Sequence, residues 1–241
     1  MDAHQHYRAP ESTLTERSNG RSGGSVEAAL AGQAPWSIGD VASQSWKLVS
    51  GFKGLFWLAM LAYIGAAIIL SGINSAINAA VGNAALAVVL ELVSNALLVP
   101  LMAGLMMLCV RRVAGAETSF SMIGNYYHQI LPLFALNIVV VILVLLGMVA
   151  LLIPGIYLAV SYALAVPLLI DKRMGIWEAM ETSRKAITKC WFRYLGLMLL
   201  SGLVMFGGAL ALGIGLIWTL PMAMLMFASV YHEMFGFEGD A

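Results

Sequence analysis

The chain has 241 residues, of which 61% are hydrophobic and only 11% are charged, and its formal net charge is zero. A soluble domain usually carries about 25% charged residues, so this composition excludes an ordinary soluble protein and is typical of a chain that crosses a membrane several times. The zero net charge gives no support for nucleic-acid binding. Cys109 and Cys190 lie close to basic residues and are expected to be free thiols.

Residues 1–35 are rich in Ser, Gly, Ala, Glu and Arg and contain no long apolar run. This composition predicts a disordered tail and gives no sign of a signal peptide. His4 and His6 are the only two imidazoles in that tail, too few for a metal site. The chain from 36 to 235 is predicted to be one membrane domain, and 236–241 a short acidic tail.

Six apolar stretches are long enough to cross a bilayer, whose hydrocarbon core of about 30 Å needs ~20 helical residues. The stretch after Pro154 is the clearest, because it carries no charge up to Ile170 and stops at Asp171, and proline suits the first turn of a helix. The six predicted spans cover about 54–73, 84–110, 130–152, 154–170, 194–212 and 216–231. The sequence therefore predicts an all-α polytopic membrane protein.

A short amphipathic segment precedes each pair of spans, at about 37–52, 118–129 and 176–193. In the third segment one face gathers apolar and small side chains, namely Ile176, Trp177, Met180, Ser183, Ile187, Cys190 and Trp191. The other face gathers polar and charged side chains, namely Glu178, Glu181, Arg184, Lys185, Thr188 and Lys189. We expect a helix on the membrane surface, with its apolar face toward the acyl chains and its cations toward the headgroups. The alternative is a surface helix packed on a soluble domain.

Proline occupies a matching position in the second span of each pair. The contexts are LLVPLMAG at Pro100, LAVPLLID at Pro167 and WTLPMAML at Pro221, and the prolines are 67 and 54 residues apart. This spacing predicts three pseudo-repeats of roughly 55–70 residues, although chance is an alternative because membrane helices tolerate proline. Two spans in each unit make the three units parallel, and each proline is a candidate hinge.

The distribution of charge predicts the orientation. All thirteen Lys and Arg residues lie before the first span, in 111–129 or in 171–193, and the loops within the pairs have none. Cytoplasmic loops of membrane proteins are rich in Lys and Arg. Both termini and all three interfacial helices are therefore expected on the cytoplasmic side of a bacterial inner membrane.

The third amphipathic helix and its flanks form the candidate binding surface. Six cations stand there against Asp171, Glu178 and Glu181, and six minus three gives a local net charge of +3. Cations near an anionic leaflet contribute about 1 kcal/mol each, and tryptophan anchors a helix at headgroup depth. The residues predicted to bind anionic lipid or an acidic partner are Lys172, Arg173, Arg184, Lys185, Lys189, Arg193, Trp177 and Trp191. The alternative is that these charges only set the topology during insertion.

Glu91 is the only acidic or basic residue within a predicted span. A charged carboxylate in hydrocarbon is costly, so this side chain should be protonated, paired or in a polar cavity. Asn95 lies one helical turn further on, and Asn137 in the third span is another candidate partner. Glu91 is thus either a proton or substrate site or a structural hydrogen-bonding group between helices.

The segments IPGIYL from Ile153, AVPLLID from Ala165 and TSRKAITKCWFR from Thr182 give the chain a resemblance to a broad set of uncharacterised bacterial multi-pass proteins. The same pattern occurs in the membrane domain attached to some glycerophosphodiester phosphodiesterases, and the resemblance covers 36–235, most strongly 153–193. It implies a multi-pass helical fold. In those phosphodiesterases catalysis belongs to a separate soluble barrel with no counterpart in this sequence, so no enzymatic activity is implied here.

The sequence contains no catalytic motif, phosphate-binding loop or metal-ligand pattern, so we expect a non-enzymatic protein without a cofactor or metal. The predicted function is that of a membrane scaffold, or of a module that binds lipid or a protein partner, another copy of the chain included, through its basic interfacial helices. The alternative is a small transporter or channel that uses Glu91 and the proline-kinked spans.

Overall fold

The computed structural model describes residues 23–210 and 213–239. This part of the chain consists of helices and connecting turns without a strand, which confirms the predicted all-α fold. Within it, five helical segments are long and apolar enough to cross a membrane: Lys53–Val81, Ala84–Ala114, Phe120–Ala150, Leu152–Asp171 and Trp191–Leu210. These segments are compatible with a multi-pass membrane protein.

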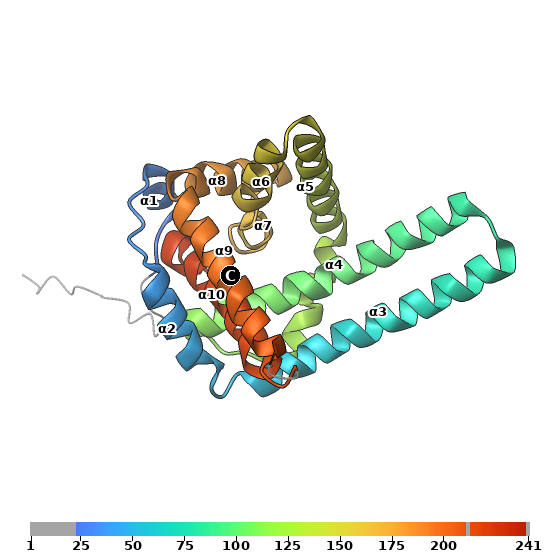
Figure 1. Cartoon of the computed structure of the whole chain (residues 1–241), viewed down its shortest axis with the longest axis horizontal. Coiled ribbons are helices and arrows are strands. Elements are labelled where there is room, and N and C mark those ends of the chain that lie inside the picture. The colour runs from blue at the N-terminus through green and yellow to red at the C-terminus, as the bar shows by residue number, and fades with distance from the viewer. Residues whose placement is uncertain (1–22, 211–212, 240–241) are drawn as a thin grey trace, which may run out of the picture.

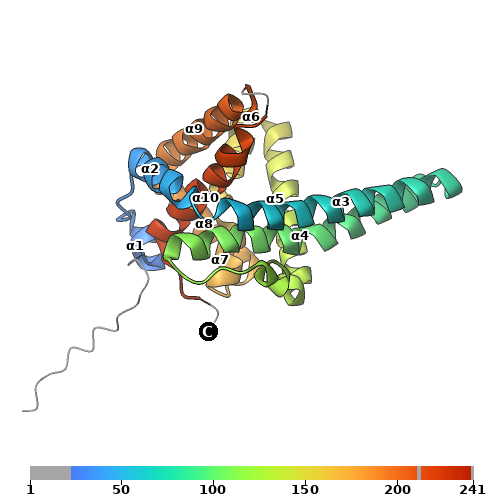
Figure 2. The ribbon, with the colours of Figure 1, turned by 90° about the horizontal axis from the view of Figure 1, so that it is seen from below.

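The first helix pair forms a long hairpin of α3 (Lys53–Val81) and α4 (Ala84–Ala114), whose joined ends project beyond the rest of the molecule (Figure 1, Figure 2). The sequence predicted that this helix ends near 73, but α3 continues to Val81 because Asn, Ser and Ala are all tolerated in a helix. The helix ends only at Gly82, the first residue with a left-handed backbone, at φ of 62°. The side chain of Asn83 then caps α4. The uncharged loop predicted between the two spans is therefore almost entirely helical.

The second pair is formed by three helices: α5 (Ile130–Ala150), α6 (Leu152–Ser161) and α7 (Ala165–Asp171). The predicted continuous span 154–170 is thus broken between α6 and α7. Pro167 has no N–H to donate to the carbonyl of Ala163, four residues earlier, which weakens a helix at this point. Ser183 stabilises the break, because its hydroxyl donates to the carbonyl of Ser161 at 2.7 Å and accepts from the N–H of Leu164 at 3.3 Å.

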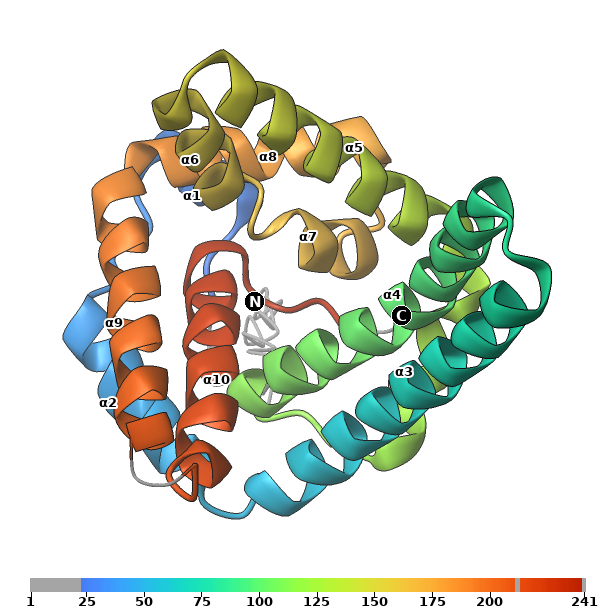
Figure 3. The same cartoon turned by 45° about the vertical axis from the view of Figure 1, so that its right-hand side comes forward.

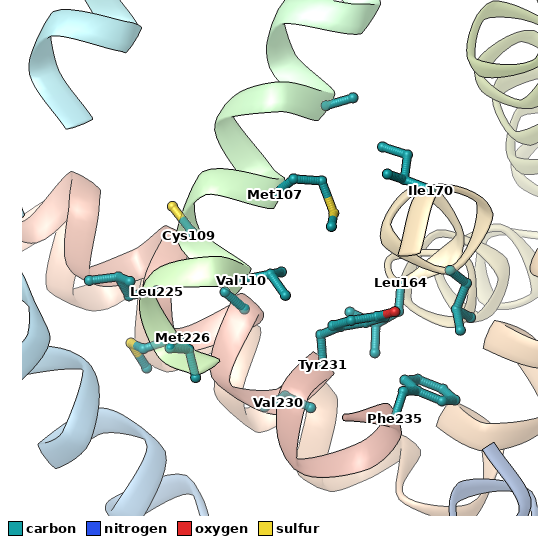
Figure 4. Packing of buried hydrophobic residues seen from close by; sticks show 14 of the residues in the cluster. Met107, Cys109, Val110, Leu164, Ile170, Leu225, Met226, Val230, Tyr231 and Phe235 are labelled. Atoms are coloured by element: carbon teal, nitrogen blue, oxygen red, sulfur yellow. The ribbon is translucent and has the colours of Figure 1, made fainter. Parts of the chain in front are cut away.

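The third pair is formed by α9 (Trp191–Leu210) and α10 (Leu216–Phe235). The sixth predicted span, 216–231, falls in α10, which is not among the five apolar segments because its last turn contains the polar side chains of His232 and Glu233 and its Trp, Thr, Pro, Ser and Tyr residues dilute the aliphatic ones. α10 lies instead at the centre of the molecule and packs against α4 and α9 (Figure 3). Its side chains are buried among protein neighbours, as Leu225, Met226 and Tyr231 show in Figure 4.

The second helices of the three pairs surround the centre. α4, α7 and α10 lie inside, and α3, α5 and α9 lie outside them (Figure 3). Each of these inner helices contains one of the predicted prolines, Pro100, Pro167 or Pro221, and all three prolines are buried. A single core of interlocking apolar side chains therefore joins the three pairs.

A short helix precedes each pair, as predicted: α2 (Ile38–Val49), η1 (Phe120–Gln129) and α8 (Ile176–Lys189). Each packs against the inner part of a different pair, η1 against α4, α8 against α6 and α7, and α2 against α10. Small side chains allow these close approaches. The hydroxyls of Ser45 in α2 and Ser229 in α10, for example, are 3.3 Å apart and buried.

Part of the N-terminal segment is folded. α1 (Val26–Ala31) begins at Ser25, whose hydroxyl accepts a hydrogen bond from the N–H of Ala28 at 3.2 Å. α1 packs against α8 and α10 and buries Ala29. Residues 26–31 of the predicted disordered tail are thus helical in the structure, where α8 and α10 supply the packing partners that so short a helix lacks by itself. His4 and His6 lie outside the described residues.

Candidate functional site

α8 is the helix predicted as the centre of the binding surface. Its small and apolar face, which includes Met180, Ser183 and Ile187, is buried against α1, α6 and α7. The expectation that this face meets the acyl chains is therefore wrong, because protein rather than lipid covers it. Trp177 is 68% exposed and lies on the charged outer side, not on the apolar side to which the sequence pattern assigned it.

Two of the six predicted cations are engaged by other parts of the protein, Lys172 with its side chain buried and Arg193 while it stays exposed. The side chain of Lys172 is only 6% exposed, and its Nζ lies 2.8 Å from Oε1 of Glu238 and 3.5 Å from Oδ2 of Asp171. The guanidinium of Arg193 donates a hydrogen bond to the backbone carbonyl of Trp36 at 3.0 Å and lies over the indole ring of Trp36. A buried ammonium needs such partners. Lys172 is therefore held inside the protein, and the exposed guanidinium of Arg193 is held against Trp36.

Arg184 is also paired, but near the surface. Its guanidinium makes two hydrogen bonds to the carboxylate of Glu181, of 2.9 and 2.7 Å. Hydrogen bonds from Arg184 hold the pKa of Glu181 at about 2, so this carboxylate is ionised at neutral pH and neutralises its partner. Lys185 lies 3.4 Å from the same carboxylate but is 58% exposed. Lys189 is exposed as well.

Five residues of the predicted surface are exposed: Arg173, Trp177, Lys185, Lys189 and Arg193. Arg193 is held against Trp36, which leaves the other four. We call these four the exposed basic face. Trp191 is not part of it, because its ring is half-buried between Tyr157, which stacks on it, and Phe192, which meets it edge-on. The exposed basic face thus carries three cations and one indole, fewer charges than the sequence suggested.

The predicted polar residues of the spans separate into two groups. Asn95 and Asn137 both line a cavity of about 330 Å³ between α3, α4, α5, α7 and α10, and Pro167 forms part of its wall. Glu91 is not among the residues that line this cavity; it is exposed on the projecting part of α4. Tyr63 of α3 is a lining residue that the sequence reasoning missed, although a lone phenol in an otherwise apolar span is a signal that could have indicated it.

The described residues contain no group of three or more His, Cys, Asp or Glu side chains that could hold a metal ion. Comparisons of the chain with protein-family models, curated proteins and solved structures found no match.

Proposed function

We propose that the chain is a non-enzymatic integral membrane protein that binds anionic lipid at its cytoplasmic face. The exposed basic face carries this proposal, because Lys185 and Lys189 are exposed on the outer side of α8 while its inner side is fixed on the protein. Cations at an anionic leaflet contribute about 1 kcal/mol each. Trp177, near the start of the same helix, is exposed enough to reach the headgroup region, which tryptophan prefers.

The proposed platform for this face is a set of three parallel pseudo-repeats, α2–α3–α4, η1–α5–α6–α7 and α8–α9–α10. The packing supports it, because the short helix of each unit lies against the inner helix of the unit before it, and α2 of the first unit lies against α10 of the last. Such a closed cycle is what a repeat about an axis along the membrane normal would produce. In this arrangement α10 is a sixth span that the other helices shelter from lipid.

The proposed orientation predicts a pattern of cysteine labelling. Cys109 is fully buried, so its labelling would not show which side of the membrane it faces. Lys185→Cys and Asn78→Cys are therefore compared in a background with Cys190→Ser, which removes the other, partly exposed thiol. Both positions are exposed. An impermeant maleimide is expected to label Asn78→Cys in intact cells and Lys185→Cys only after the membrane is opened. The reverse pattern would show that the orientation is wrong.

Lipid binding is tested with Lys185→Gln/Lys189→Gln. Each lost cation should weaken binding by about 1 kcal/mol, or about fivefold, so the double variant should bind about 25-fold more weakly. The measurement is native mass spectrometry of the full chain in mixed micelles of phosphatidylglycerol and phosphatidylcholine. Glu178→Gln, which removes an acid from the same exposed side of α8, is the matched control and should bind at least as well as the parent. Unchanged phosphatidylglycerol occupancy of the double variant at low and moderate salt would contradict the proposal.

The cavity between the helices favours a second candidate, a small transporter or channel. Asn95, Asn137 and Pro167 meet there, which is the kind of polar site within the membrane that transport requires. Glu91, however, is not at the cavity, so a path that depends on its ionisation has less support than the prediction assumed.

A further inference from the structure

The cavity lies between α10 and helices of four segments that are apolar enough to cross a membrane, α3, α4, α5 and α7. Its wall includes three methionines, Met102 and Met106 of α4 and Met224 of α10. Methionine side chains are flexible and polarisable, so such a wall adapts to apolar ligands of different shapes. The volume, about 330 Å³, falls within the range of small-molecule sites.

Three polar side chains from three different helices interrupt this wall. They are Tyr63 of α3, Asn95 of α4 and Asn137 of α5, and none of them has a hydrogen bond to any described residue. In a membrane little water reaches such groups, and an amide without a partner is unfavourable there. The three groups together offer both donors and acceptors of hydrogen bonds.

Among the residues that the structure describes, those that line the cavity include no acidic or basic side chain. A charged headgroup would therefore enter without a counter-charge, at a high desolvation cost. An uncharged hydroxyl or carbonyl group would instead find the donors and acceptors that the two amides and the phenol provide. Asn95 and Met102 are exposed, so on the α4 side the cavity opens to the surface of the helix bundle.

We propose that this cavity binds a neutral amphiphile, whose hydroxyl or carbonyl head hydrogen-bonds with Tyr63, Asn95 and Asn137 while its apolar part lies along the methionine wall. This site is distinct from the exposed basic face, which lies on α8 and selects anionic headgroups. The two sites differ in ligand charge, so each proposal fails or succeeds independently of the other.

The test uses the full chain in detergent and two probes with the same acyl chain, monoolein and oleic acid at a pH that ionises it. Monoolein should bind and oleate should bind at least tenfold more weakly. Asn137→Leu, which keeps the volume and removes the amide, should weaken monoolein binding about fivefold, in line with the loss of one neutral hydrogen bond. Asn78→Leu, at an exposed asparagine outside the cavity, should leave it unchanged.

Tyr63→Phe provides the second variant in case Asn137→Leu does not fold, because it removes a single hydroxyl group. It should also weaken monoolein binding severalfold and leave phosphatidylglycerol binding unchanged. Equal binding of oleate and monoolein, or unchanged monoolein binding by folded Asn137→Leu or Tyr63→Phe, would overturn the proposal.

Discussion

Gly104→Ala is expected to lower the melting temperature of the purified protein by about 2–12 °C. A Cβ atom at Gly104 would collide with the backbone of Ile123, including its carbonyl oxygen, where α4 meets η1. Backbone cannot rotate away as a side chain can, so α4 and η1 would have to separate. Such overpacking costs about 1–3 kcal/mol, and each kcal/mol corresponds to about 2–4 °C for a chain of this size.

Gly124→Ala is the matched control. Gly124 lies in η1 next to Ile123, and a Cβ atom there would meet nothing within 4 Å. The same chemical change in the same region should therefore shift the melting temperature by less than about 1 °C, as is usual for surface substitutions. Thermal unfolding in detergent, followed by intrinsic tryptophan fluorescence, measures both variants. Similar shifts for the two would mean that the close approach of α4 and η1 is absent.

Helix ends marked by charge or proline were largely predictable from the sequence. α4 ends at Ala114, within one turn after Arg111 and Arg112, and α7 ends at Asp171. Both ends carry charge because charged groups avoid the hydrocarbon region and cluster at its edge. The end of α3 was not predictable in the same way. The sequence around Asn74 and Asn78 predicted a loop. In the structure the side-chain amide of Asn74 donates to the hydroxyl of Ser94 across the hairpin at 3.0 Å, a contact that exists only once α4 is in place.

The partner of an amphipathic face was not predictable from periodicity. A helix advances about 100° per residue, which places Trp177 nearly in line with Arg184 and Thr188 and away from Ser183. The structure follows this geometry, with Trp177 exposed and Ser183 buried at the break between α6 and α7. The pattern identified two faces of α8 correctly for most residues, but whether lipid or protein covers the apolar face depends on helices elsewhere in the chain.

The candidate binding residues were only partly predictable, for a related reason. Composition shows that Lys172 and Arg193 are cations at the end of a span, but not what pairs with them. Lys172 meets Glu238, 66 residues away, and Arg193 meets the carbonyl of Trp36, 157 residues away. Contacts over such separations follow from the tertiary fold, so the sequence alone did not show that these two cations are engaged by other parts of the chain.

Asp171→Ala is expected to destabilise the protein by about 3 kcal/mol, because it removes one partner of a buried charged group. Its carboxylate accepts hydrogen bonds from the hydroxyl of Tyr231 at 2.7 Å and from the N–H of Glu238 at 3.2 Å. Figure 4 shows Tyr231 extending from α10 toward the helix of Ile170, so the carboxylate joins α7, α10 and the segment after α10. Lys172 would keep Glu238 as its partner, which limits the loss.

The melting temperature should accordingly fall by about 6–12 °C for Asp171→Ala. Glu181→Ala is the matched control, because Glu181 is also paired with cations but is 31% exposed. Ion pairs at the surface contribute about 0–1 kcal/mol, so its melting temperature should change by less than about 4 °C. Equal shifts for the two acids would contradict the assignment of Asp171 to a buried network.

Asp171→Leu/Lys172→Met separates the loss of packing from the loss of charge pairing. Replacing both members of a buried ion pair with apolar side chains is often neutral or stabilising, whereas removing Asp171 alone leaves the buried ammonium of Lys172 to the exposed carboxylate of Glu238. The double variant should therefore recover part of the stability that Asp171→Ala loses. The part not recovered should be about 1 kcal/mol for each of the two hydrogen bonds that Asp171 accepts, from the hydroxyl of Tyr231 and the N–H of Glu238. A double variant no more stable than Asp171→Ala would show that Asp171 acts through Tyr231 and Glu238 alone, and that Lys172 gains nothing from its neighbour.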